Sequence, residues 1–265
     1  MKSGIIFSFT AIMVMAIMIV SCSKSVNTLG DDPDPYDVLR KQLAQSPRDN
    51  EEAELMTLWL SGDIVAYSLD YNRVRDALNV LRQTYSDSIP QLDSIHFVYP
   101  DQESGIAVIL SESATDELRV GSFVDWDSLN TLFQMETIDT SQLATSRQVD
   151  LTFKGRLNPS LLAHYYMQLD GVTGTGFYPR TVDYSNLYPW TLGDNHTFLL
   201  RKAWGNCENE CQNNHFWYFR VSGSNAVFVG ELLWSSGVSL PDWWDEASVA
   251  LCRYSTALQT KFCYP

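Results

Sequence analysis

The stretch VDLTFKGRLNPSLLAHYYMQLDGVTGTGF, residues 149–177, decides the fold that the sequence predicts. Apolar and polar residues alternate from Val149 to Phe153, as they do in a half-buried strand. Asn158 and Pro159 then supply a capping side chain and a proline at the first helical position. Gly171 ends this helix, and residues 172–178 resume as a strand. The stretch therefore predicts a strand, a helix and a second strand.

The residues before this stretch extend the pattern towards the N-terminus. They predict a strand over 106–110, a short helix opened by Asp125 and a weak strand near 135–138. The order from residue 106 onward resembles the ferredoxin-like split βαβ arrangement. Residues 149–177 also resemble the βαβ unit of subtilisin propeptides and their inhibitor relatives. The second resemblance implies a role as a partner of an exported protease.

Helices and a β-meander are predicted on either side of this region. Helices are expected over 36–45, 49–62 and 71–85, and the second opens with Asp49 and Glu52 as a capping box and stops at Gly62. A strand is expected over 95–99, an antiparallel meander over 197–204, 215–222 and 226–233, and a terminal helix over 242–258. Both faces of the middle meander strand carry apolar residues, which predicts a strand covered on each side. The predicted fold class is α+β, with helices packed on a mainly antiparallel sheet and a C-terminal meander and helix stapled by disulfides.

The composition and charge of the chain exclude several classes of protein. Of its 265 residues, 45% are hydrophobic and 19% are charged, which excludes a disordered, collagen-like or coiled-coil chain. Lys and Arg number 18 against 32 Asp and Glu, so the formal net charge is −14. Because a polyanion must be met by basic side chains that release its counterions, nucleic acid is not expected as a partner.

The first 22 residues predict export and a lipid anchor. An apolar run from Ile5 to Val20 follows Lys2, and at about 1.5 Å per residue it is shorter than a hydrocarbon core of about 30 Å. This is the pattern of a signal peptide. Residues 19–22, Ile-Val-Ser-Cys, resemble the lipobox of bacterial lipoproteins, in which the chain is cut before the cysteine and the cysteine is acylated. The resemblance implies that acylated Cys22 anchors the protein in a bilayer. Ser23 after the cysteine favours the outer membrane, and it does not distinguish the two leaflets. The alternative is an ordinary cleaved signal peptide without a lipid.

The predicted organisation of the chain follows from this processing. Residues 1–21 form the signal peptide, and residues 22–35, rich in Ser, Asn, Gly, Asp and Pro, form a flexible tether. Residues 36–92 are expected to form a helical region and 93–265 an α+β domain with the cysteine-containing meander. The alternative is a single domain over 36–265.

Four cysteines remain beside Cys22, and they allow two interpretations. Exported thiols are usually oxidised, so we favour disulfides that join Cys207 to Cys211 and Cys252 to Cys263, although four cysteines allow three connectivities. The second disulfide requires the terminal helix to end between its cysteines, because a straight helix would hold them roughly 16 Å apart. The alternative is a tetrahedral zinc site. Its ligands would be His196, Cys207, Cys211 and His215.

Residues 204–219 carry the most distinctive motif of the chain: Trp-Gly, a cysteine pair separated by three residues, and His-x-Trp-x-Phe. This motif resembles a cassette of a group of uncharacterised secreted bacterial lipoproteins. The helix end LSGDI at 60–64 matches the same group, whereas Glu208-Asn209-Glu210 departs from the small residues usual between its cysteines. The resemblance implies a compartment and a fold, and it supplies no mechanism.

Enzyme signatures are missing from the sequence. It contains no G-x-S-x-G, H-E-x-x-H or P-loop motif, and Gly171, Gly174 and Gly176 follow a helix instead of opening one. We expect structural roles for His96 in a strand and for His164 beside the apolar stripe of a helix. No catalytic residue and no cofactor is therefore assigned, and an enzyme is not favoured.

Clustered aromatic residues suggest a binding surface instead. Two groups in loops would form a platform for a sugar ring or a protein partner, or else they plug the ends of the β core, and their exposure distinguishes the two. The seven rings are Tyr178, Tyr184, Tyr188, Trp190, Trp234, Trp243 and Trp244. The first functional hypothesis is a lipid-anchored, non-catalytic binding module of the cell envelope with a protein or carbohydrate ligand. The alternatives are an inhibitor or propeptide-like partner of an exported protease and an envelope hydrolase, which would need a deep pocket with a histidine or convergent acids.

Overall fold

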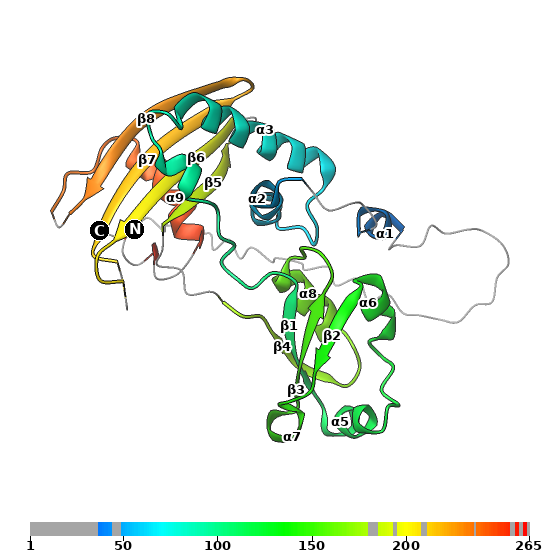
Figure 1. Cartoon of the computed structure of the whole chain (residues 1–265). Helices are drawn as coiled ribbons and strands as arrows, with labels where there is room; N and C mark the ends of the chain where they lie inside the picture. Colours follow the sequence, from blue (N-terminus) through cyan, green and yellow to red (C-terminus); the bar gives the residue numbers. More distant parts are fainter. Residues whose placement is uncertain are drawn as a thin grey trace, which may run out of the picture. The chain divides into compact units, whose positions relative to one another are not determined.

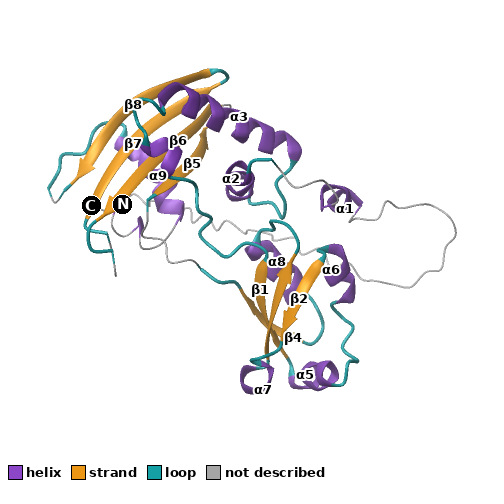
Figure 2. Cartoon of the chain, in the orientation of Figure 1, coloured by secondary structure: helices purple, strands orange, loops and turns teal. Residues whose placement is uncertain are grey.

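A computed structural model gives the fold of the chain from residue 37 onward. It describes residues 37–43, 49–179, 185–192, 195–207, 211–235, 237–254, 258–259 and 262–263. Two hydrophobic cores lie within these residues, each built on a four-stranded antiparallel sheet (Figure 1). Helices pack on both sheets (Figure 2), so the expected α+β class is confirmed.

The first sheet comprises β1 (Gly105–Leu110), β2 (Met135–Asp139), β3 (Gln148–Phe153) and β4 (Val172–Gly176). Its strand order is β2-β3-β1-β4, and each neighbouring pair is antiparallel. Four helices lie in its connections: α5 (Glu112–Arg119) and α6 (Asp127–Leu132) after β1, α7 (Leu143–Ser146) after β2, and α8 (Pro159–Met167) after β3. This order of elements and strands is the ferredoxin-like split βαβ arrangement that the sequence predicts.

Helix α8 begins where the sequence predicts. The Oδ1 atom of Asn158 accepts hydrogen bonds from the Ser160 and Leu161 N–H groups, and Pro159 occupies the first helical position. Leu162 and Tyr166 are fully buried in the first core, which they share with the inward-facing residues of β3. The short helix α1 (Asp37–Leu43) contributes Leu39 to the same core.

Helices α2 (Glu51–Ser61) and α3 (Ser68–Tyr85) share the second core with the C-terminal sheet. The expected helical region therefore has no core of its own. Asn50, and not the predicted Asp49, is the N-cap of α2, and its Oδ1 atom accepts from the Ala53 N–H at 3.0 Å. Gly62 ends α2 as predicted, with a left-handed φ of 70° that favours glycine.

The segment 95–99 follows α4 (Gln91–Ser94) and has the predicted alternation of buried residues, but it pairs with no strand among the described residues. Side chains satisfy its backbone instead. The Phe97 N–H donates to Glu52 at 2.8 Å, and the Val98 N–H donates to the Oδ1 atom of Asn186 at 3.0 Å. The Tyr254 hydroxyl donates to the Val98 carbonyl. The predicted strand is wrong, because these side chains bind the backbone of 95–99 where a neighbouring strand would. Glu52 thus binds the Phe97 N–H instead of capping helix α2 as predicted.

The second sheet is a meander of β5 (Asn186–Leu192), β6 (Asn195–Trp204), β7 (Asn213–Ser222) and β8 (Asn225–Trp234), in that spatial order. Strand β7 is an inner strand and is covered on both faces, as predicted. On one face Tyr85 of α3 contacts Phe219, and on the other Trp244 of α9 (Trp244–Tyr254) contacts Phe216. The two helices thus lie over opposite faces of this sheet (Figure 1).

Strand β5 occupies residues that we expected to form a loop. Pro189 favours that expectation because proline has no N–H to donate within a sheet. β5 is an edge strand, however, and a proline is tolerated where one side of the strand faces no partner. Register with β6 is continuous from Asn186↔Arg201 to Leu192↔Asn195, so β5 is a full member of the second sheet.

Candidate functional site

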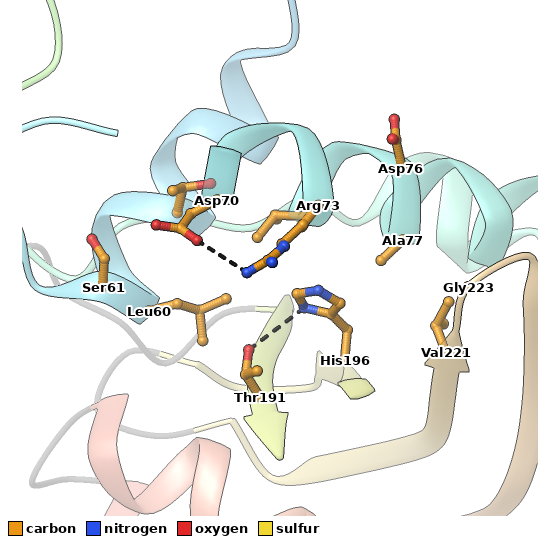
Figure 3. A pocket seen from close by; sticks show the side chains of 12 residues that line it. Leu60, Ser61, Asp70, Arg73, Asp76, Ala77, Thr191, His196, Val221 and Gly223 are labelled. Atoms are coloured by element: carbon orange, nitrogen blue, oxygen red, sulfur yellow. Dashed lines mark hydrogen bonds and ion pairs between the residues drawn. The ribbon is translucent and has the colours of Figure 1, made fainter. Parts of the chain in front are cut away.

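A cleft of about 550 Å³ lies at one end of the second sheet, between its strands and helices α2 and α3 (Figure 3). Its volume falls in the range of small-molecule sites, roughly 300–1,000 Å³. The lining residues come from segments far apart in the sequence. They are Thr57, Leu60, Ser61, Asp70, Arg73, Val74, Asp76, Ala77, Thr191, His196, Val221 and Gly223.

His196 projects into this cleft from the second residue of β6, opposite Val221 of β7. Its Nδ1 atom lies 3.5 Å from the Thr191 hydroxyl of β5. Burial, and secondly the positive charge of Arg73, lowers the pKa of His196 below its usual value of 6.5. Both causes disfavour the imidazolium, so the ring is neutral at neutral pH.

Arg73 and Asp70 lie one turn apart on α3 above the imidazole (Figure 3). The Arg73 Nη1 atom is 3.7 Å from the Asp70 Oδ1 atom, which is an ion pair but is longer than a hydrogen bond. The Arg73 side chain is 60% exposed, and its guanidinium points towards His196. A positive charge and a neutral imidazole therefore meet at this end of the cleft.

Apolar side chains form part of the wall of the cleft. Val74, Ala77 and Val221 are buried side chains that contribute to its wall, together with the partly buried Leu60. The Thr57 hydroxyl also lines the cleft, but it donates to the Ala53 carbonyl of its own helix at 2.6 Å. The arrangement can hold a small molecule with an apolar part on the wall and a polar part between His196 and Arg73.

Both expected disulfides are present. One joins Cys207 to Cys211, and the other joins Cys252 to Cys263 with their Cα atoms 6.0 Å apart. This distance is far below the roughly 16 Å of a straight helix between the two cysteines, so the condition that a straight helix does not join them is met. The second disulfide fixes the chain next to Phe262, whose ring packs against Trp244 in the second core.

The zinc alternative is wrong, because its two thiols form a disulfide. Its histidines are also far apart: His196 pairs with Val221, whereas His215 pairs with Lys202. Positions 196 and 202 on β6 are separated by roughly 20 Å at about 3.3 Å per residue. Within the ranges that the structure describes, no three His, Cys, Asp or Glu side chains form a group that could hold a metal ion.

The predicted aromatic residues do not form one surface. Tyr188 and Trp244 are 1% and 2% exposed and lie in the second core, on strand β5 and helix α9, so a surface platform that includes them is wrong. The ring of Trp190 lies under the Arg253 guanidinium, with 4.6 Å between the ring centroid and the guanidinium carbon. The other four predicted aromatic residues do not share one location. Trp234 and Trp243 pack against Trp244, Tyr178 contacts Asp150 of the first sheet, and Tyr184 lies outside the described residues.

The distinctive motif around the first disulfide lies at the far end of β6 and β7 from the cleft. His215 stacks on Trp217 with 3.8 Å between ring centroids, and its Nε2 atom is 3.1 Å from a Glu231 carboxylate oxygen. Lys202 lies over the ring of Trp204, which is 39% exposed. These contacts account for the aromatic and histidine positions of the motif without a ligand.

The residues that predict export and anchoring, Cys22 and the tether over 22–35, lie outside the described residues. Among the helices that the structure describes, none combines the length and the apolar character needed to cross a membrane.

The chain matches no protein-family model, no curated protein and no solved structure. Sequence reasoning singled out His196 only as a zinc ligand and missed Arg73, Asp70 and Thr191. No motif links these four, because α3 and the β5–β6 hairpin meet only in the folded chain.

Proposed function

We propose that this protein is a lipid-anchored binding protein of the bacterial cell envelope, and that the cleft at His196 holds its ligand. The observation that carries the proposal is the combination of an apolar wall with a neutral histidine and an arginine in one cleft of about 550 Å³. Few polar groups at fixed positions in an apolar pocket are typical of a site that orients a small molecule.

The anchor is supported by the signal peptide, the lipobox-like residues 19–22 and the polar tether that follows. Two or more acyl chains, at about 0.8 kcal/mol per buried methylene, would hold the domain at the bilayer. Expression of the full chain in a Gram-negative host tests this by intact mass. We expect a mature chain that begins with acylated Cys22, and a Cys22→Ala variant without lipid. A wild-type chain cleaved elsewhere and free of lipid would overturn the anchor.

Binding is favoured over catalysis by the geometry around His196. A histidine that activates a hydroxyl nucleophile lies within about 2.6–3.2 Å of it, whereas the Thr191 hydroxyl is 3.5 Å from His196. The Arg73 charge also lowers the pKa of His196, which weakens the imidazole as a base. The envelope hydrolase alternative is therefore less well supported than a binding role, although its histidine-containing pocket is present.

A fragment screen by ligand-observed NMR tests the binding role. The full chain in detergent is compared with Thr191→Trp, which places an indole in the cleft, and with Val120→Trp, which adds the same indole at a site 79% exposed and outside the cleft. We expect fragments that bind the wild type and Val120→Trp but lose binding to Thr191→Trp. Fragments that bind all three proteins equally, or no fragment binding, would refute the proposed site.

The inhibitor of an exported protease remains the second candidate. It is favoured by the split βαβ strand order of the first sheet, which contains the stretch 149–177 that resembles propeptide units. Incubation of the full chain with a broad panel of secreted serine proteases tests it. Inhibition that survives Thr191→Trp would favour this candidate over the cleft, and no inhibition across the panel would exclude it.

A further inference from the structure

We infer that the cleft at His196 selects a carboxylic acid with an apolar body, whose carboxylate replaces Asp70 as the partner of Arg73. The inference rests on the proposed function and names the chemical class of its ligand.

The Arg73 guanidinium can bind a ligand carboxylate more tightly than it binds its present partner, the Asp70 carboxylate. Within the described part of the chain, its ionic contact is to Asp70 at 3.7 Å, beyond hydrogen-bond distance. A guanidinium has five N–H donors in a planar fork, which bind a carboxylate best through two parallel hydrogen bonds. Since the Arg73 side chain is 60% exposed, a ligand can reach these donors from the cleft.

His196 adds a second donor beside Arg73. Burial and the Arg73 charge keep the imidazole neutral, and a neutral imidazole has one N–H. In the tautomer with its hydrogen on Nε2, the ring presents this donor to the cleft while Nδ1 faces the Thr191 hydroxyl at 3.5 Å. Two donors that converge from α3 and β6 favour an anionic ligand.

One acid of the cleft, Asp76, is already hydrogen-bonded to an arginine, which makes it a weaker partner for a cationic ligand. Asp76 accepts two hydrogen bonds from Arg75, at 2.9 and 3.1 Å. Asp70 is the partner of Arg73. The charged residues that line the cleft with His196 are these two acids and Arg73, and the positive charge of Arg73 acts directly on the imidazole.

The apolar residues of the cleft indicate that the ligand also has an aliphatic part. Leu60, Val74 and Val221 line the same cleft as His196 and Arg73, and a branched aliphatic group would be removed from water against them. N-acetyl-leucine combines such a group with one carboxylate. N-acetyl-leucinamide is its neutral counterpart and differs from it only at the carboxyl group, whereas leucinamide is cationic and also lacks the acetyl group.

Isothermal titration of the full chain in detergent with these three probes tests the inference. We expect N-acetyl-leucine to bind at least tenfold more tightly than either amide, because hydrogen bonds between two charged groups are stronger than those to a neutral amide. Arg73→Gln should weaken its binding by about tenfold or more. Asp70→Asn should strengthen it by up to about fivefold, because it removes the competing carboxylate.

Asp76→Asn is the matched control, since it neutralises an acid of the same cleft that is bound to Arg75. We expect it to change the affinity less than Asp70→Asn does. Tighter binding of either amide, or weaker binding by Asp70→Asn, would overturn the carboxylate inference while the binding role stands. If neither these probes nor any screened fragment engages the cleft, the proposed function fails as well.

Discussion

Replacement of Asn158 by alanine should destabilise the chain by about 2 kcal/mol. Its Oδ1 atom caps α8 through the Ser160 N–H at 3.1 Å, and loss of an N-cap costs about 1 kcal/mol. Its Nδ2 atom donates to the Gly62 carbonyl at the end of α2, at 3.2 Å, and a typical internal hydrogen bond contributes about 1 kcal/mol. Because the side chain is 6% exposed, water cannot readily replace both contacts.

Urea unfolding of the wild type and the variant, followed by tryptophan fluorescence, measures this difference in the free energy of unfolding. Asn158→Asp is the control, because it retains the capping oxygen and loses the donor to Gly62. We expect it to lose about 1 kcal/mol, roughly half of the effect of alanine. A loss of under about 0.5 kcal/mol for Asn158→Ala, the size usual for an indifferent surface position, would refute the reasoning.

Three further predictions concern the second core and the cleft. In Gly230→Ala a Cβ atom would lie 2.4 Å from Nε1 of Trp243, so we expect overpacking to cost about 1–3 kcal/mol in urea unfolding, against little change for Gly176→Ala, which meets nothing within 4 Å. Replacement of Cys252 and Cys263 by serine should lower the free energy of unfolding by about 2–4 kcal/mol, and an unchanged urea midpoint would contradict a structural role for that disulfide. Because the folded chain lowers the pKa of His196 below 6.5, the unfolded chain takes up a proton first as the pH falls. From roughly pH 7 to pH 5 the wild type should therefore lose more stability than His196→Gln, and an equal loss would contradict a lowered pKa of His196.

Much of the fold follows from local sequence patterns. The Asn158-Pro159 start of α8, the left-handed Gly62 at the end of α2 and the alternation in β3 were predicted and confirmed, because each depends on residues within one turn or one strand. Helix α5 was missed, because only Ala114 and Thr115 of it are buried and no apolar stripe is present. Its one local signal is Ser111, whose side chain caps the helix.

Other parts of the fold depend on contacts that no local pattern contains. The segment 95–99 has the alternation of a strand, yet Glu52 and Asn186, distant in sequence, provide its hydrogen-bond partners. The edge position of β5, which tolerates Pro189, is likewise set by the whole sheet. The cleft could not be predicted for the same reason, because Arg73 and His196 come together only when α3 packs on the second sheet.

The most direct test of the proposed function uses the histidines as internal probes. The chain has four, and of these only His196 lines the cleft; the others are His96, His164 and His215. The full chain, labelled at the histidine ring carbons and assigned with His196→Gln, is titrated with the fragments that bind it. We predict that the ring signal of His196 shifts with ligand concentration while the other three stay in place. Bound fragments that leave His196 unchanged, or that shift another histidine, would contradict a ligand site in this cleft.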